Sequence, residues 1–280
     1  MKQEKKMDIR LIAFDLDGTF LDDKKNISGA NLRALEQAAA RGVLLVPATG
    51  RIYRGLPEPL RTLPFLRWHI LINGACVYDS REDRSLVRED VTCARALEFY
   101  EYADSLGVLY DCYQDNWGYM TAWMLEEVLR IIPDPGARDL IRSLRSPVPE
   151  LKEYLRQRGE GVQKLQMYFS DLKQRLRTLE ELPERFPDLS VTTSMPFNIE
   201  INARAATKGQ ALLSLCAHLG LDPSQAMALG DDTNDLDMLR LSGLGVAMGN
   251  AAPTVRAAAD AVTGNNNESG FAAAVEKYVL

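Results

Sequence analysis

The chain has 280 residues, enough for two domains, and an ordinary globular balance of 46% hydrophobic and 26% charged residues argues against large-scale disorder. Its formal net charge is −6 at pH 7, and no basic stripe interrupts the sequence. This charge argues against nucleic acid and against an anionic membrane surface as partners.

Residues 1–6 are mostly charged and lead into only a short apolar run, which predicts neither a signal peptide nor a membrane span. The four cysteines lie far apart and show no paired spacing, as is typical of free thiols in a reducing compartment. We therefore expect a cytoplasmic protein. Only two histidines are present, so a Ser-His-Asp hydrolase or a histidine-rich metal site is poorly supported.

The first strongly patterned element is the apolar run at residues 9–14, which predicts a buried strand. Helical patterns alternate with such strands along the chain, which is typical of a parallel sheet covered on both faces. The run ends at Asp15, Asp17 and Gly18. Ligands of parallel sheets bind beyond the carboxyl ends of the strands, so both carboxylates are expected at an active-site edge.

The same order of strand and polar residue recurs twice before residue 75. Residues 30–36 predict a helix, and residues 43–48 predict a second buried strand that leads into Thr49. A third predicted strand, at residues 69–72, ends at Asn73. This order predicts an α/β fold with a doubly wound, Rossmann-like parallel sheet.

The character of the sequence changes at residues 80–84, whose charges are typical of a linker between domains. The following stretch mixes helical and strand-like patterns, including a predicted hairpin at residues 108–121, and this mixture predicts an inserted α+β domain. The other elements predicted there are helices at 92–106, 123–131, 139–144 and 171–181 and strands at 162–169, 189–193 and 198–201. We expect the core to comprise residues 1–83 and 198–280, and the inserted cap domain residues 84–197.

The first pattern resumes at Thr207, which is predicted to cap a helix at residues 208–219. Residues 226–229 predict another buried strand, followed by an acidic segment that includes Asp231. Further strands are predicted at 244–248 and 261–263, and further helices at 236–241, 252–259 and from 270 onward. Two halves of one sheet therefore bracket the insert.

Four groups of polar residues are predicted to meet at one edge of this sheet: Asp15 with Asp17, Thr49, Lys208, and Asp231 with Asn234 and Asp235. Each group alone would more often be a turn or a helix cap, so it is their convergence that indicates a site. Two carboxylates about 4 Å apart repel by about 1 kcal/mol in water and about 4 kcal/mol at an effective dielectric of about 20, so the cluster requires a cation. Oxygen ligands favour Mg²⁺, and a lysine beside them favours phosphoryl transfer.

These residues lie in segments that resemble the four motifs of the haloacid dehalogenase (HAD) superfamily. The segments are Asp15-Leu16-Asp17-Gly18-Thr19, Ala48-Thr49-Gly50-Arg51, Thr207-Lys208-Gly209 and Gly230-Asp231-Asp232-Thr233-Asn234-Asp235. Their order, with the insert between the second and third, resembles the Cof-type sugar-phosphatase branch, which has an α/β (C2-type) cap. Asp232 and Phe20 depart from the usual motif residues, but neither departure removes a catalytic group.

The resemblance implies a phosphatase that uses Mg²⁺ to hydrolyse small phosphorylated metabolites, such as sugar phosphates or phosphorylated cofactors. It implies that Asp15 forms an aspartyl phosphate and that Asp17 serves as general acid and base. The implied phosphate-binding residues are Thr49 and Lys208, with Gly50, Arg51 and Asn73 as further candidates for substrate contacts. The implied Mg²⁺ ligands are Asp15, the backbone carbonyl of Asp17, Asp231, and, directly or through water, Asn234 and Asp235.

Three alternatives remain open at this point. A phosphomutase or phosphotransferase would use the same aspartyl phosphate but would need a cap that shields it from water. A phospho-accepting signalling receiver also has acidic, Thr and Lys residues at strand ends, but the inserted domain argues against it. A non-catalytic metabolite-binding relative would more naturally have lost Asp15 or Asp17. We expect the insert to be a lid that selects the substrate, and the protein to be a monomer or homodimer.

Overall fold

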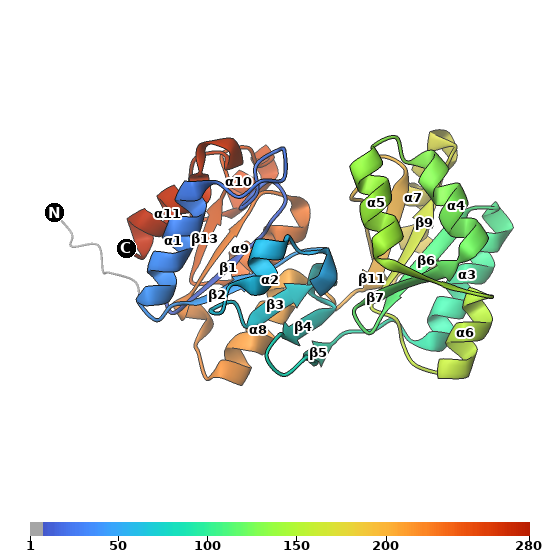
Figure 1. Ribbon diagram of the computed structural model, residues 1–280, viewed down its shortest axis with the longest axis horizontal. Helices are drawn as coiled ribbons and strands as arrows, with labels where there is room; N and C mark the ends of the chain where they lie inside the picture. The colour runs from blue at the N-terminus through green and yellow to red at the C-terminus, as the bar shows by residue number, and fades with distance from the viewer. Residues whose placement is uncertain (1–7) are drawn as a thin grey trace. The chain divides into compact units, whose positions relative to one another are not determined.

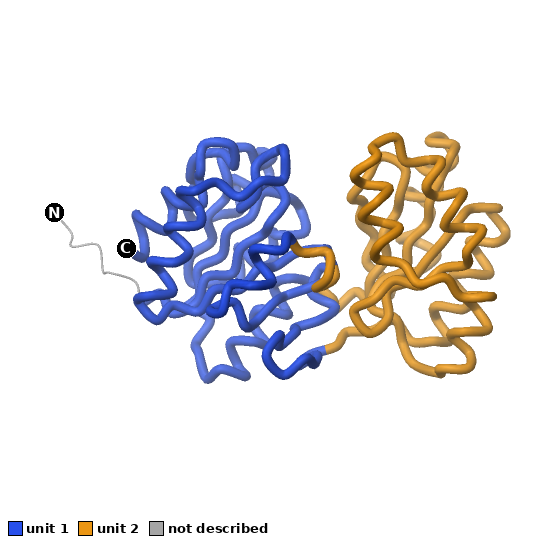
Figure 2. The backbone as a smooth tube through the Cα atoms, viewed as in Figure 1, with its two compact units in different colours: residues 1–51, 57–87, 207–280 blue, residues 52–56, 88–206 orange. Residues whose placement is uncertain are grey.

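The computed structural model describes residues 8–280, so the charged residues 1–6 discussed above lie outside the described part. The described chain divides into two compact units, shown in Figure 2. Unit 1 comprises residues 8–51, 57–87 and 207–280, and unit 2 comprises residues 52–56 and 88–206. Within residues 8–280, no helix combines the length and the apolar character needed to cross a membrane.

Unit 1, which contains β1, β2 and β13 in Figure 1, is built on a five-stranded parallel sheet. Its strand order is β14-β13-β12-β1-β2. The strands are β1 (Leu11–Phe14), β2 (Leu44–Pro47), β12 (Ala226–Gly230), β13 (Leu244–Ala247) and β14 (Ala261–Val262). The predicted parallel α/β sheet is therefore confirmed, including the return of the chain to the same sheet after the insert. β1 lies between β2 and β12, so the segments that follow these three strands emerge side by side.

Helices cover both faces of this sheet, as expected for a doubly wound fold. Leu11 and Ala13 of β1 pack in one apolar cluster with Leu212 of α8. Phe14 contacts Phe271 of α11 on the opposite side of the strand. The helices of unit 1 are α1 (Gly29–Ala40), α2 (Glu58–Thr62), α8 (Lys208–Leu219), α9 (Leu236–Leu241), α10 (Pro253–Ala258) and α11 (Gly270–Tyr278). Period-two alternation within β1 thus separates the two layers of the core.

The helix ends follow the capping signals of the sequence. Thr207 Oγ1 accepts a hydrogen bond from the backbone N–H of Gln210 and so caps α8, as predicted. Gly220 ends α8 in the left-handed region, at a φ of 66°. Short 3₁₀ segments occur at η1 (Tyr53–Gly55), η2 (Ile72–Gly74), η3 (Pro223–Gln225), η4 (Thr233–Asp235) and η5 (Asn266–Glu268).

A second, three-stranded sheet extends unit 1 beside β2. It has the order β3-β4-β5, with β3 (Trp68–Leu71), β4 (Cys76–Asp79) and β5 (Arg84–Arg88), and β3 and β4 are antiparallel. Of the charged residues 80–84, predicted to be a linker, residues 80–83 instead form the turn between β4 and β5, and Arg84 begins β5. A charged turn and a charged linker have the same composition, so the sequence alone does not separate them.

Unit 2 contains a six-stranded mixed sheet with the order β10-β11-β9-β6-β7-β8. Its strands are β6 (Leu109–Gln114), β7 (Trp117–Thr121), β8 (Arg145–Val148), β9 (Lys164–Tyr168), β10 (Leu189–Thr192) and β11 (Asn198–Ala203). Its helices are α3 (Cys93–Leu106), α4 (Ala122–Ile131), α5 (Pro135–Ser143), α6 (Leu151–Arg158) and α7 (Leu172–Arg185). The predicted α+β character and the β6–β7 hairpin are confirmed, whereas β8 and α6 were not predicted.

The expected boundary between cap and second core part is corrected by strand pairing. We placed residues 198–280 in the core, but β11 (Asn198–Ala203) pairs antiparallel with β9 and β10 and belongs to unit 2. The division falls after residue 206, and the earlier one falls after residue 87 rather than 83. The sequence of a strand does not indicate which strand it pairs with. A domain boundary that is placed from the local sequence pattern therefore cannot take the pairing of β11 into account.

Candidate active site

Polar residues from four distant segments lie together at the carboxyl edge of the unit 1 sheet. Asp15 directly follows β1, Asp231 directly follows the neighbouring strand β12, and Lys208 is the first residue of α8. Thr49 lies two residues beyond the end of β2. The parallel order of β2, β1 and β12 places these strand ends at one edge, which is where α/β sheets bind ligands.

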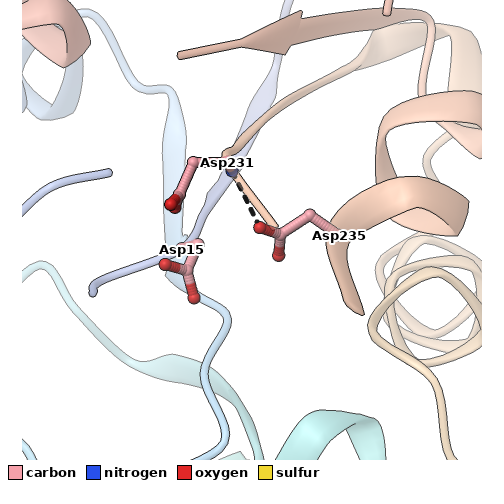
Figure 3. Close-up of side chains that lie close together, drawn as sticks. All are labelled: Asp15, Asp231 and Asp235. Carbon is pink, nitrogen blue, oxygen red and sulfur yellow. Dashed lines mark hydrogen bonds between the residues drawn. The ribbon is translucent and has the colours of Figure 1, made fainter. Parts of the chain in front are cut away.

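An acidic cluster forms the centre of this edge (Figure 3). Asp15, Asp231 and Asp235 each contribute one carboxylate oxygen, and these oxygens all lie within 4.8 Å of one another. The ammonium Nζ of Lys208 lies 2.6 Å from Asp15 Oδ1 and 2.7 Å from Asp235 Oδ1. The Lys208 side chain is fully buried, so these two carboxylates replace the water that an ammonium normally requires.

The electrostatics of the cluster show an excess of negative charge. Burial raises the pKa of Asp15 well above its usual range, although the Lys208 ammonium opposes the rise. Burial also raises the pKa of Asp231, to about 6, against the hydrogen bond from Thr19. Burial alone would lower the pKa of Lys208, but Asp15 and Asp235 raise it above its ordinary value, so the lysine stays charged. Three carboxylates with one ammonium leave two negative charges, which one divalent cation would balance.

Asp235 organises the loop after β12 as well as contacting Lys208. Its Oδ2 accepts hydrogen bonds from the backbone N–H groups of Asp231, at 2.9 Å, and Asp232, at 3.1 Å. Its Oδ1 is the atom that contacts Lys208. Both carboxylate oxygens of Asp235 therefore have partners, and the carboxylates of Asp15 and Asp231 lie beside each other in the cluster (Figure 3).

Asp231 is oriented by Thr19, a residue of the first motif that was not among the predicted site residues. The Thr19 hydroxyl donates to Asp231 Oδ1 at 2.7 Å, and Thr19 is fully buried. The hydroxyl and the carboxylate belong to segments 212 residues apart, so the spacing gave no signal for this contact. Only the parallel pairing of β1 with β12 brings the two loops together.

The carboxylate of Asp17 lies outside the acidic cluster and is held by two cations. Arg51 donates to it twice, from Nε to Oδ2 at 2.9 Å and from Nη2 to Oδ1 at 2.7 Å. Lys25 Nζ lies 2.9 Å from Oδ1. Burial alone would raise the pKa of Asp17, but Arg51 and Lys25 outweigh it and lower the pKa to about 2. Arg51, predicted as a possible substrate contact, is thus bonded to the predicted acid–base residue.

The remaining predicted phosphate contacts form a second group around Asn73. Thr49 is buried, and its carbonyl accepts from the backbone N–H of Asn73 at 3.0 Å. Asn73 Oδ1 accepts from Asn234 Nδ2 at 3.2 Å and would lie 2.8 Å from a Cβ on Gly50. The structure therefore places Thr49, Gly50, Asn73 and Asn234 together, and it directs the amide of Asn234 toward Asn73.

The loop that presents Asn73 has an unusual backbone. Ile72 has a φ of 55° and Asn73 a φ of 58°, and a β-branched residue in this left-handed region is a genuine outlier. Gly74 follows at a φ of 98°, and a Cβ there would lie 2.1 Å from the carbonyl oxygen of Thr207. The close approach of Gly74 to the start of α8 holds this strained loop in place, as is typical of a functional site.

The donor set fits Mg²⁺. Carboxylate oxygens are the ligands that hard divalent cations prefer, and Asp15, Asp231 and Asp235 present them within bonding reach of one point. No histidine or cysteine joins this group among the described residues, so zinc would find none of its usual nitrogen or sulfur ligands. Of the residues predicted as ligands, Asp15 and Asp231 would hold the ion through their side chains.

Fold and site together define a hydrolase of the HAD type, and the sequence bears this out. The chain belongs to the haloacid dehalogenase-like hydrolase family, whose sequence profile matches residues 12–275. This match includes parts of all three segments of unit 1 and all of unit 2, so the insert is part of the family architecture. The resemblance noted from the four motifs, including that to the Cof-type branch, is confirmed.

Individual relatives align along nearly the whole chain. It is 33% identical over 281 residues to 5-amino-6-(5-phospho-D-ribitylamino)uracil phosphatase YcsE of Bacillus subtilis, covering 99% of each chain. It is 31% identical to phosphatase YwpJ of the same organism, covering 94% of this chain and 98% of the relative. The crystal structure of TM0651 from Thermotoga maritima superposes with a TM-score of 0.79 at 29% identity, covering 97% and 98% of the two chains. The protein is a HAD-type phosphatase, a phosphoric monoester hydrolase.

Proposed function

We propose that this phosphatase hydrolyses phosphate monoesters of small metabolites in two steps, with Mg²⁺ and with Asp15 as the nucleophile. The observation on which this rests is the convergence of Asp15, Asp231 and Lys208 at one sheet edge, with the ammonium 2.6 Å from Asp15. Bound Mg²⁺ would neutralise the carboxylates and polarise the phosphoryl oxygens. Lys208 supplies a fixed positive charge beside the transferred group.

In the first step, a carboxylate oxygen of Asp15 attacks phosphorus while the bond from phosphorus to the ester oxygen breaks. Asp17 gives its proton to the departing alkoxide, which leaves as a neutral alcohol. In the second step, Asp17 takes a proton from water, and the resulting hydroxide attacks phosphorus. The bond between phosphorus and Asp15 then breaks, which releases inorganic phosphate and restores both carboxyl groups.

Two observations support a substrate class: the substrate in the name of one relative, and the separate apolar core of unit 2. YcsE is named for the phosphate monoester of a ribitylaminouracil, which is a small polar metabolite with a primary alcohol as leaving group. Unit 2 has its own apolar core and the fold of a cap, and caps in such enzymes exclude water and contact the leaving group. We propose sugar phosphates, polyol phosphates and phosphorylated cofactor precursors as substrates, with unit 2 selecting among them.

Phosphate release from a panel of phosphomonoesters, with and without Mg²⁺, tests this proposal. The panel includes 5-amino-6-(5-phospho-D-ribitylamino)uracil and several hexose phosphates. We expect release that depends on Mg²⁺, and a loss on the order of 10⁴-fold or more in Asp15→Asn. The control Asp139→Asn removes an exposed carboxylate of α5 and should stay within about twofold of the parent.

Other outcomes would contradict the proposal in distinct ways. Undiminished hydrolysis by Asp15→Asn would exclude it as the nucleophile. Phosphoprotein that accumulates without turnover would indicate a phospho-accepting receiver. Transfer of phosphate to added sugar in preference to water would indicate a phosphotransferase.

A further inference from the structure

Asn250, at the edge of the acidic cluster, has no role assigned by the four motifs. It lies three residues beyond the end of β13, the strand next to β12. Its Nδ2 donates to the carbonyl oxygen of Gly18 at 2.8 Å and lies 3.5 Å from Asp231 Oδ2. Its Oδ1 accepts from the backbone N–H of Asn266 at 3.0 Å. One amide thus joins the loops that follow three different strands, β1, β13 and β14.

Gly18 contacts both Asn250 and Asp231. A Cβ on Gly18 would lie 2.3 Å from Asp231 Oδ2, so the Gly18 backbone is packed directly against that carboxylate. Gly18 has a φ of 86°, a conformation that its missing side chain permits. Any shift of the Gly18 peptide would therefore move the surface on which Asp231 rests, and Asn250 holds this peptide by its carbonyl.

We propose that Asn250 is a positioning residue for the cation site. It fixes the loop of residues 15–19 and, through Gly18, keeps the Asp231 carboxylate turned toward Asp15. Thr19 holds Oδ1 of Asp231, and Asn250 together with Gly18 bounds Oδ2, so the carboxylate is confined from both sides. This inference rests on the proposed function, because it assumes that a divalent cation binds Asp15 and Asp231.

Asn266 anchors Asn250 in turn. The Asn266 amide donates to the carbonyl of Leu21 and to Asp23 Oδ1, at 3.1 and 3.0 Å, and Asn266 is buried. Residues that orient metal ligands without touching the metal typically affect affinity 10–100-fold. The contacts of Asn250 are of this kind, because it donates to the carbonyl of Gly18, whose backbone packs against the proposed metal ligand Asp231.

Binding of Mn²⁺, measured by electron paramagnetic resonance of the free ion, tests this role without relying on turnover. We expect Asn250→Ala to weaken Mn²⁺ binding by about tenfold or more. The matched control is Asn267→Ala, which removes an amide of the same loop network that bonds to Asp23 rather than to the cation site. This control should bind Mn²⁺ within about twofold of the parent.

Kinetics separate positioning from a general structural effect. In Asn250→Ala we expect the Mg²⁺ concentration for half-maximal rate to rise about tenfold, with kcat at saturating Mg²⁺ reduced less than about threefold. Equal Mn²⁺ binding by the parent and Asn250→Ala would overturn the inference and leave the proposed function intact. A fall in kcat without a change in Mg²⁺ requirement would also overturn it. Absence of Mn²⁺ binding to the parent would overturn both proposals.

Discussion

The contacts of Asp17 with Arg51 and Lys25 favour its ionised form, whereas the first step of the proposed reaction needs its protonated form. With a pKa of about 2, the ionised form of Asp17 predominates at pH 7. Two contacts from Arg51 and one from Lys25 maintain this state. Asp17 must therefore leave these cations before it can act as an acid, whereas the ion-paired carboxylate is already suited to act as a base in the second step.

Replacement of Arg51 by Met should raise the pKa of Asp17 from about 2 toward its ordinary value of 3.8, because the strongest opposing charge is removed while the length of the side chain is nearly kept. The measurement is the pH dependence of the Asp17 carboxyl signal in the NMR spectrum of protein with ¹³C-labelled aspartate. Lys24→Met is the control, since Lys24 acts on Asp22, and it should leave the Asp17 signal unchanged. An unshifted pKa in Arg51→Met would show that the ion pair does not set the state of Asp17.

The placement of the strand-end residues could be predicted from the sequence, but their partners could not. Asp15 and Asp231 follow apolar runs in an α/β pattern. A parallel sheet brings such positions to one edge, independently of the conformation of the loops. The contacts of Asp17 with Arg51 and Lys25 depend on loop paths and side-chain rotamers, for which no periodic signal exists. The same holds for Thr19 and Asn250, which are recognised only once β1, β12 and β13 are seen side by side.

At the level of elements, the sheet of unit 2 contains a buried ion pair that spans three strands. Arg145 of β8 lies opposite Gly118 of β7, and its Nε donates to Asp111 of β6 at 2.5 Å. A Cβ on Gly118 would lie 2.4 Å from Arg145 Cδ, so the glycine leaves the space through which the arginine crosses β7. The carboxylate also accepts from Gln166 and Tyr168, at 2.9 and 3.0 Å. Both charges are therefore buried and paired.

Removing one member of this pair should be far more costly than removing both. Arg145→Met leaves the Asp111 charge buried without its cation, and we expect unit 2 to lose about 3–5 kcal/mol of unfolding free energy. Arg145→Met combined with Asp111→Leu should lose much less, because no unpaired charge remains. Urea denaturation of both single variants and the double variant gives the coupling energy.

The exposed pair Arg142–Asp139 of α5 is the matched control for this cycle. Its atoms are 3.7 Å apart and its side chains are 54% and 82% exposed, so Arg142→Met should change the unfolding free energy by less than about 0.5 kcal/mol. A coupling energy for Asp111 and Arg145 that is no larger than that of this exposed pair would contradict the expectation.

The elements of unit 2 were harder to predict than those of unit 1 for a physical reason. Strands of unit 1 are short apolar runs buried on both faces, and helices alternate with them regularly. In unit 2 one face of β9 and β11 presents buried polar residues, such as Lys164 and Glu200, which ion-pair at 2.6 Å. Such residues weaken the apolar signal of a strand. Strand β11 was therefore recognised as a strand but assigned to the wrong domain.

At the scale of the molecule, the two units have separate apolar cores, and the residues of the proposed chemistry belong to unit 1 alone. Asp15, Asp17, Lys208 and Asp231 all lie within residues 8–51 and 207–280. A cation that binds this site therefore stabilises the fold of one unit directly. The chain connects the units at four places, after residues 51, 56, 87 and 206.

Calorimetry should consequently show two unfolding transitions, of which Mg²⁺ raises only one. At a Mg²⁺ concentration about 100 times the dissociation constant, the stabilisation of unit 1 is expected to be about 2.7 kcal/mol. Arg145→Met should lower the other transition and so assign it to unit 2. A single transition would show that the units unfold as one, and equal shifts of two transitions with Mg²⁺ would show that the cation stabilises both units.

The pH dependence of the Mg²⁺ stabilisation provides a further check in the same experiment. The raised pKa of Asp231 predicts whether this stabilisation grows or shrinks as the pH falls. Burial raises the pKa of Asp231 to about 6 from an ordinary value of 3.8, so without metal the folded form binds the proton more tightly than the unfolded chain. The metal-free protein therefore gains stability from this group as the pH falls from 6 toward 4. Mg²⁺ must displace that proton, so its stabilising shift should be full above pH 7 and shrink below pH 6. In metal-free Asp231→Asn the part of this gain that comes from Asp231 should disappear, while the raised pKa of Asp15 keeps a gain of the same sign. Metal-free stability that rises from pH 6 to pH 4 as much in Asp231→Asn as in the parent would assign the whole gain to another group.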